Sequence, residues 1–184
     1  TDEYPSLPMS EPNGKVLISS SSLAEAMRCC RPFAANDELR PTMNGVYFDF
    51  TGEALTCVAT DGHRLIRKRV ADAKREGDTP IAAIVSSNTA GLLAYLPKDA
   101  DVTVEINETQ TRYSCKGYTL VARSIDGRYP NYNSVIPPNN PKHADIDRTD
   151  TANALKRVSI MGSKTTGLVR LQFDSDMMGG RLTV

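Results

Sequence analysis

The feature that most constrains the fold is a repeated order of elements. Residues 14–70 predict a strand, a helix and three alternating runs, and residues 81–124 predict the same order again. The two copies lie about 65 residues apart and share little side-chain identity, so the repeat is one of structure. Two such copies make one domain, whose helices we expect to cover one face of antiparallel sheet. The predicted class is therefore α+β.

Apolar spacing and turn residues place the elements of both copies. In the first copy, Ser21 or Ser22 is the expected helix cap, and the elements lie at residues 14–19, 23–34, 46–50, 55–59 and 63–70. In the second copy, Asn88 is the expected cap, and the elements lie at residues 81–86, 88–96, 102–106, 111–116 and 118–124. The polar residues 71–79 interrupt the pattern between the two copies.

A third copy begins near the end of the chain and is incomplete. We expect a strand at residues 144–148, a helix capped by Thr149 or Asp150, and an alternating run from Leu168. The chain then ends at Val184, inside a predicted strand. Because an unpaired apolar strand exposes edge groups that natural domains avoid, we expect the chain to be a piece of a longer protein.

Composition excludes several classes of protein. The 22 basic and 22 acidic residues give zero net charge, which argues against a domain that is basic all over. No apolar run approaches the roughly 18 residues of a membrane span, and the start does not resemble a signal peptide, so we expect a cytoplasmic location and no membrane partner. The four cysteines form no metal-ligand pattern and are expected to be reduced, and no cofactor or metal is expected: Cys29, Cys30, Cys57 and Cys115.

Two short strings could carry chemistry. The first, Thr60–Leu65 (TDGHRL), reads either as a hairpin turn or as part of a small hydrolase using His63 with Asp61. The second, residues 126–132 (DGRYPNY), reads equally as an extended linker or as a rigid aromatic and proline surface for peptides. The basic run from Arg64 to Arg75 favours a solvated outer strand over a phosphate-binding track.

Together these strings resemble the bacterial sliding clamp family, the beta subunit of DNA polymerase III. The resemblance rests on RPTMNGVYFDF (40–50), VATDGHRL (58–65), DGRYPNYNSVIP (126–137) and KRVSIMGSKTTGLVRL (156–171). It implies the DNA-clamp fold, with each domain built from two βαβββ halves. On that map residues 1–13 are an interdomain linker, 14–138 the complete middle domain, and 139–184 the truncated first half of the third domain.

The resemblance also implies a function without catalysis. Two full-length subunits would close into a homodimeric ring around duplex DNA. Short linear peptides would then tether the polymerase III catalytic subunit, the clamp loader, other polymerases and repair proteins. The implied peptide cleft comprises Met43, Thr60, Gly62, His63, Arg64, Leu65, Pro130, Ser134, Val135 and Thr166.

Candidate DNA-facing residues are the basic side chains on or near the predicted helices: Arg28, Arg31, Lys98, Lys156, Arg157 and Lys164. Thr165 and Thr166 stand where many relatives carry a larger side chain, so we expect a shallower cleft there. We also expect this chain to bind such peptides more weakly than a full-length clamp. A peptide-binding β module without a DNA role, and a hydrolase using His63, are the alternatives.

Overall fold

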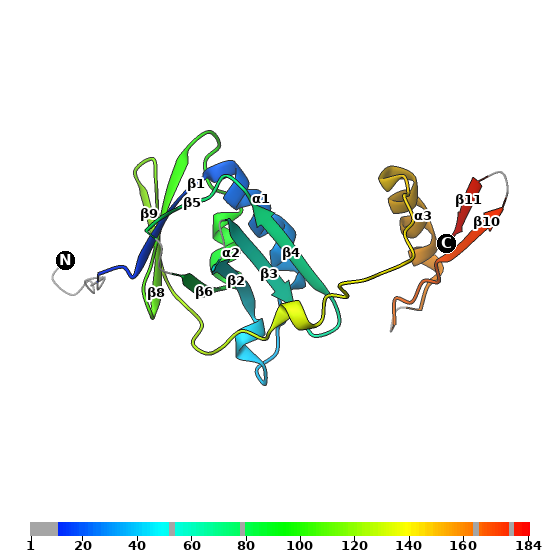
Figure 1. Ribbon diagram of the computed structural model, residues 1–184, viewed down its shortest axis with the longest axis horizontal. Helices are drawn as coiled ribbons and strands as arrows, with labels where there is room; N and C mark the ends of the chain where they lie inside the picture. The colour runs from blue at the N-terminus through cyan, green and yellow to red at the C-terminus, as the bar shows by residue number, and fades with distance from the viewer. Residues whose placement is uncertain (1–10, 52–53, 78–79, 164–165, 177–178) are drawn as a thin grey trace. The chain divides into compact units, whose positions relative to one another are not determined.

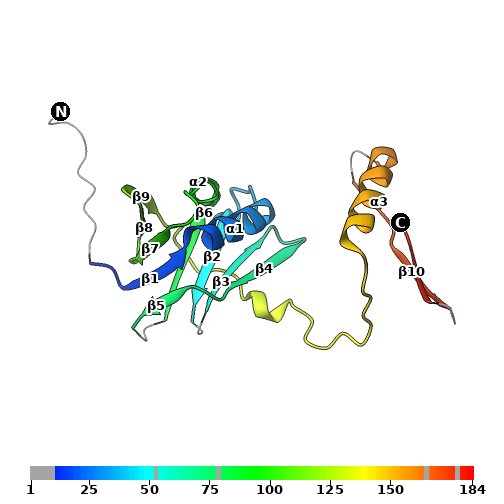
Figure 2. The same cartoon turned by 90° about the horizontal axis from the view of Figure 1, so that it is seen from above.

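The chain divides into two compact units, Thr1–Ile136 and Pro137–Val184. The computed structural model describes residues 11–51, 54–77, 80–163, 166–176 and 179–184 (Figures 1 and 2). The linker predicted at residues 1–13 lies mostly outside the described residues. The assignment of 14–138 and 139–184 to successive clamp domains stays a prediction.

The first unit contains the two predicted copies. The first copy comprises β1 (Gly14–Ser19), α1 (Ser20–Cys30), β2 (Gly45–Phe50), β3 (Leu55–Thr60) and β4 (Leu65–Val70). The second comprises β6 (Ile81–Ser86), α2 (Ser87–Leu93), β7 (Asp101–Ile106), β8 (Gln110–Cys115) and β9 (Tyr118–Arg123). Short 3-10 turns lie at η1 (Arg31–Phe33), η2 (Pro41–Met43) and η3 (Tyr132–Ser134).

The two copies exchange their first strands. One sheet has the order β5-β1-β7-β8-β9 and the other β4-β3-β2-β6, so β1 joins the second copy and β6 joins the first. All of these neighbours pair antiparallel. Neither copy can therefore complete its sheet without the other, which ties both copies into one folding unit.

The helix caps repeat as closely as the strands. The side chain of Ser19 accepts from the Ser22 N–H in α1, and that of Ser86 accepts from the Thr89 N–H in α2. Each cap is thus the last residue of the preceding strand, and the predicted caps at Ser21 or Ser22 and at Asn88 were wrong. A serine hydroxyl satisfies one of the free N–H groups at a helix start, which fixes where each helix begins.

One hydrophobic core fills the space between the helices and both sheets. The apolar face of α1 enters it with Leu23, Ala26, Met27 and Cys30, all fully buried. Both views show α1 and α2 side by side. The predicted helix through Leu96 ends instead at Leu93, and the polar connection at residues 71–79 contains β5 (Lys74–Glu76), which pairs with β1.

The second unit holds α3 (Arg148–Met161), β10 (Gln172–Asp176) and β11 (Gly179–Thr183). The predicted strand at residues 144–148 was wrong, because residues 141–147 form no strand and Arg148 begins α3. The cap is Asp147, whose carboxylate accepts from the Asp150 N–H at 2.7 Å, rather than Thr149 or Asp150. The strand expected from Leu168 begins at Gln172.

Candidate functional site

The sheet β4-β3-β2-β6 has an outer face turned away from the helices. Along β2, Phe48 and Phe50 enter the main core, whereas Tyr47 packs in a separate cluster on the opposite face. The segment that follows β9, residues 125–135, crosses this outer face. It starts where the Ile125 N–H donates to the Ile84 carbonyl at 2.9 Å, and Figure 1 shows it passing β2 and β3.

Aromatic packing fixes the segment to the sheet. The rings of Tyr47 and Tyr129 stack with centroids 4.7 Å apart and an interplanar angle of 3°, and Tyr132 lies tilted at 6.4 Å from Tyr47. Val58 and Ile84 are buried in the same cluster. Such ring pairs contribute about 0.5–1.5 kcal/mol beyond the area that they bury. Of the two interpretations of residues 126–132, this packing favours a rigid aromatic and proline surface over an extended linker, and its role toward peptides stays a prediction.

A hydrogen bond to a carboxylate holds the end of the segment. The Tyr132 hydroxyl donates to Asp49 Oδ2 at 2.7 Å, and the N–H and hydroxyl of Thr51 donate to Asp49 Oδ1 at 2.9 and 2.6 Å. Burial raises the pKa of Asp49, but these hydrogen bonds outweigh it and lower the pKa below its ordinary value. Burial and the nearby carboxylate raise the pKa of Tyr132 to about 12, so the bond joins a neutral phenol to a carboxylate.

The turn between β3 and β4 is built by its own side chains. The Thr60 hydroxyl accepts from the Gly62 N–H at 3.0 Å and donates to the Arg64 carbonyl at 2.8 Å. The Asp61 carboxylate accepts from the N–H groups of His63 and Arg64 and from Arg64 Nε at 2.9 to 3.0 Å. Those donors lower the pKa of Asp61 to about 2. Gly62 has φ +88°, which favours glycine.

This geometry does not favour the hydrolase alternative. A base that activates a nucleophile is oriented by a carboxylate that accepts from its imidazole. Here both oxygens of Asp61 accept from the backbone or from Arg64, and within the described ranges no bond joins Asp61 to the His63 ring. The Asp61 carboxylate thus shapes the turn and leaves His63 exposed beside it.

Two contacts that sequence reasoning missed place this turn against its neighbours. The Arg64 guanidinium lies 4.9 Å above the Phe33 ring and donates to the Pro32 carbonyl at 2.9 Å. Arg40 also lies beside the turn, since a Cβ on Gly62 would lie 2.5 Å from Arg40 Nη1. Arg40 directly precedes η2, which carries Met43. No local pattern links these residues to the turn, because the contacts span 22 residues or more of chain.

Most of the predicted cleft residues therefore lie on the first unit around one face. Leu65 packs in the outer cluster with Tyr129, which precedes Pro130, and Val135 is 67% exposed at the end of η3. We call the following set the cleft wall: Met43, Thr60, Gly62, His63, Arg64, Leu65, Pro130, Ser134 and Val135. Thr166 is exposed in the second unit, and its membership stays a prediction, as does the role of every residue in the wall.

Two of the predicted DNA-facing residues join the helices. Arg28 donates to the Ala94 carbonyl at 2.9 Å, and Arg31 donates through Nε to the Ser87 carbonyl at 3.1 Å. Both side chains remain exposed, so each guanidinium keeps further N–H donors toward solvent. Lys98, Lys156 and Arg157 are exposed, the last two on α3. Lys164 lies outside the described residues.

The parts of the chain that the structure describes contain no group of three or more acidic, histidine or cysteine residues placed to hold a metal ion. None of the helices described is both long enough and apolar enough to span a membrane.

Known proteins match the chain along most of its length. The family model of the DNA polymerase III beta subunit, central domain, matches residues 17–131. The beta sliding clamp of Synechococcus elongatus is 27% identical over 179 residues, covering 95% of this chain and 48% of that relative. The beta sliding clamp of Bacillus subtilis is 28% identical over 163 residues, which cover 87% of this chain and 43% of that relative. The chain thus spans about half the length of the curated relatives that it matches.

Solved structures share the fold. The sliding clamp of Bacillus subtilis superposes with a TM-score of 0.81 at 24% identity, covering 99% of this chain and 51% of that one. A sliding clamp from Pseudomonas aeruginosa bound to griselimycin also superposes with a TM-score of 0.81 at 24% identity, and the match covers 95% of this chain and 47% of that one. The expected α+β clamp fold is confirmed. The duplicated halves, the exchanged strands and the match to the family model together show that this chain belongs to the DNA polymerase III beta subunit family, the bacterial sliding clamps.

Proposed function

We propose that the chain is part of a DNA polymerase processivity factor and that its cleft wall binds short linear peptides of replication and repair proteins. The observation that carries this proposal is the meeting of two distant strings, TDGHRL and RYPNYNSV, on one outer face. The hairpin turn supplies backbone and polar groups, and the segment after β9 supplies proline and apolar groups. The family membership supports the same conclusion.

The cleft wall has properties suited to a peptide. Gly62 is exposed at the tip of the turn with φ +88°, so the turn offers its own backbone to a ligand, with the Arg40 guanidinium beside it. Val135 offers an exposed apolar side chain, and Leu65 lies half-buried at the base of β4. The hydrogen bond from Tyr132 and the stacked rings hold the wall before any ligand arrives, which reduces the entropy lost on binding.

We propose a weak, sequence-independent contact of the helix face with duplex DNA in the full-length ring, which two subunits would form. Arg28, Arg31 and Lys98 are exposed. Each of the two arginines already donates one hydrogen bond, Arg28 to the Ala94 carbonyl and Arg31 to the Ser87 carbonyl. A few screened contacts to phosphates suit sliding better than tight binding. In this account the protein is not an enzyme, and the ring keeps a tethered polymerase on its template.

Calorimetric titration of the 184-residue chain tests the peptide-binding part. The ligand is a synthetic peptide from the polymerase III catalytic subunit, and the variant is Val135→Asp. Losing the burial of one valine costs about 1.5 kcal/mol, which is about a tenfold loss of affinity. Leu39→Asp is the matched control, because Leu39 is 90% exposed and lies outside the cleft wall. Equal losses in both variants, or no loss in Val135→Asp, would contradict the proposal.

A further inference from the structure

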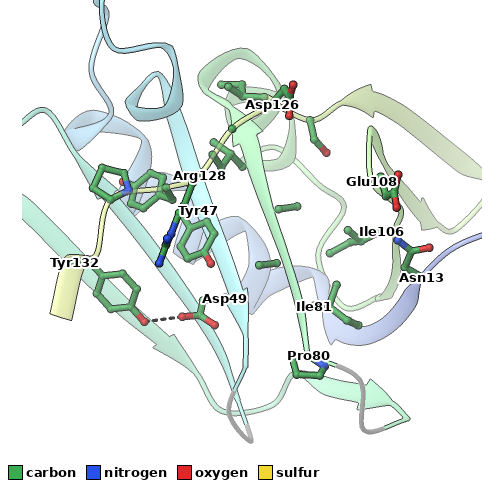
Figure 3. A pocket seen from close by; sticks show the side chains of 18 of the residues that line it. Asn13, Tyr47, Asp49, Pro80, Ile81, Ile106, Glu108, Asp126, Arg128 and Tyr132 are labelled. Atoms are coloured by element: carbon green, nitrogen blue, oxygen red, sulfur yellow. Dashed lines mark hydrogen bonds between the residues drawn. The ribbon is translucent and has the colours of Figure 1, made fainter.

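A second groove lies beside the segment that crosses the outer face, and residues 125–133 of that segment line it. The cavity has a volume of about 620 Å³ and is lined by β6, by the turn between β7 and β8, and by residues 124–133. Figure 3 shows β6 along its base, with Tyr47 and Asp49 on one side and Asn13 and Glu108 on the other. None of the predicted cleft residues except Pro130 lines it.

The base of this groove is an open strand edge. β6 is the last strand of its sheet and pairs with β2 along its whole length. On its other edge it makes an isolated bridge from Val85 to Ser124, and the Ile84 carbonyl accepts from the Ile125 N–H. Beyond that point the segment turns away, at Gly127 with φ +116°.

The alternation of an antiparallel strand then fixes the direction of the Ala82 backbone. Because Ile84 directs its carbonyl to the open edge, Ala82, two residues earlier, directs its N–H and carbonyl to the same edge. Ala82 is exposed and lines the cavity. Among the described residues no strand pairs with this part of the edge. An extended chain laid in the groove can exchange backbone hydrogen bonds with Ala82.

The charges of the groove select the occupant. The side chains of Asp49, Glu108 and Asp126 line it against one guanidinium, that of Arg128, which reaches toward Tyr47. Glu108 and Asp126 are exposed, and neither has an ion pair within the described ranges. In the same ranges the buried hydroxyl oxygen of Ser124, another lining residue, has no hydrogen-bond partner. The groove therefore offers a net negative charge beside the open edge of β6.

We propose that this groove binds an extended, lysine-rich or arginine-rich peptide segment by strand addition to the open edge of β6 at Ala82. Glu108 and Asp126 attract the cationic side chains, while Ala82 supplies backbone bonds that are independent of the peptide sequence. This site shares only Pro130 with the cleft wall and does not depend on the function proposed for that wall.

The test measures binding of two capped heptapeptides to the full chain, one alternating lysine with threonine and one alternating glutamate with threonine. We expect the lysine peptide to bind about tenfold tighter or more, since like charges repel the other. The double variant E108Q/D126N should lose about three- to fivefold in affinity for the lysine peptide. The matched control E38Q/D145N changes two exposed carboxylates elsewhere and should lose nothing.

Amide chemical shifts of the labelled chain locate the bound peptide. The Ala82 amide should be among the most strongly shifted, and Ala82→Pro should weaken binding because proline lacks the N–H that faces the open edge. If Ala82→Pro does not fold, the double variant E108Q/D126N and the map of amide shifts still test the proposal. Equal binding of both peptides, equal losses in both double variants, or shifts centred on the cleft wall would overturn the proposal.

Discussion

Tyr132→Phe removes one hydroxyl from the bond that holds the end of the crossing segment. The bond is 2.7 Å long and its acceptor is the ionised carboxylate of Asp49. A hydrogen bond to a charged group contributes about 1.5–3 kcal/mol. Because Tyr132 is only half-buried and Asp49 keeps its two bonds from Thr51, we expect a loss of about 1–2 kcal/mol in the free energy of unfolding.

Urea unfolding followed by circular dichroism measures this loss. With a slope of about 2 kcal/mol per molar urea, the midpoint should fall by roughly 0.5–1 M. Tyr118→Phe is the matched control, because Tyr118 is 67% exposed on β9 and should be neutral. The carboxyl pKa of Asp49, followed by NMR, should rise in Tyr132→Phe because a donor to the charged form is lost. An unchanged midpoint together with an unchanged Asp49 pKa would refute the reasoning.

Three further predictions concern the turn and the core. Gly62→Ala should destabilise the protein by about 1 kcal/mol, as should the control Gly117→Ala at φ +83°. Urea unfolding measures both losses. Only Gly62→Ala should also weaken peptide binding. The pKa of Asp61 is lowered from 3.8 to about 2 on folding, so the stability that its carboxylate contributes is present above about pH 4 and is lost as the pH falls through about 2. In acid unfolding, the free energy of unfolding of Asp61→Asn should therefore fall less steeply between these pH values than that of the unchanged chain. An equally steep fall would contradict this. Burial raises the pKa of Cys30 to about 12. Iodoacetamide at pH 8 should therefore leave this thiol unmodified in the folded chain and alkylate it in urea. Mass spectrometry of the Cys30 peptide measures the extent of alkylation in each case.

Local patterns predicted most elements of the first unit but not how they pair. Gly14–Ser19 and Ile81–Ser86 were predicted with the bounds that the structure has. The exchange of these strands between the copies could not be predicted, because alternation gives the face of a strand and not its partner. The short strand Lys74–Glu76 was missed because its residues are charged, and it is stabilised by pairing with the edge of β1.

In the candidate site, too, local contacts could be predicted from the sequence and long-range contacts could not. The side chains of Thr60 and Asp61 bond within the turn, mainly to its backbone, so a local motif could indicate it. Tyr132 and Asp49 are 83 residues apart, and only the crossing of the segment over the sheet brings them together. In the second unit, residues 144–148 alternate weakly, but the Asp147 carboxylate caps a helix instead, so the local capping bond determined the structure there.

We propose above all that the cleft wall on the first unit is a peptide-binding surface. Amide chemical-shift mapping of the labelled chain, titrated with the peptide from the polymerase III catalytic subunit, tests it most directly. We expect the largest shifts on Gly62, His63, Leu65 and Val135, with the amide of Ala82 unchanged. Saturating shifts that avoid these four residues, or no shifts at any peptide concentration, would contradict it.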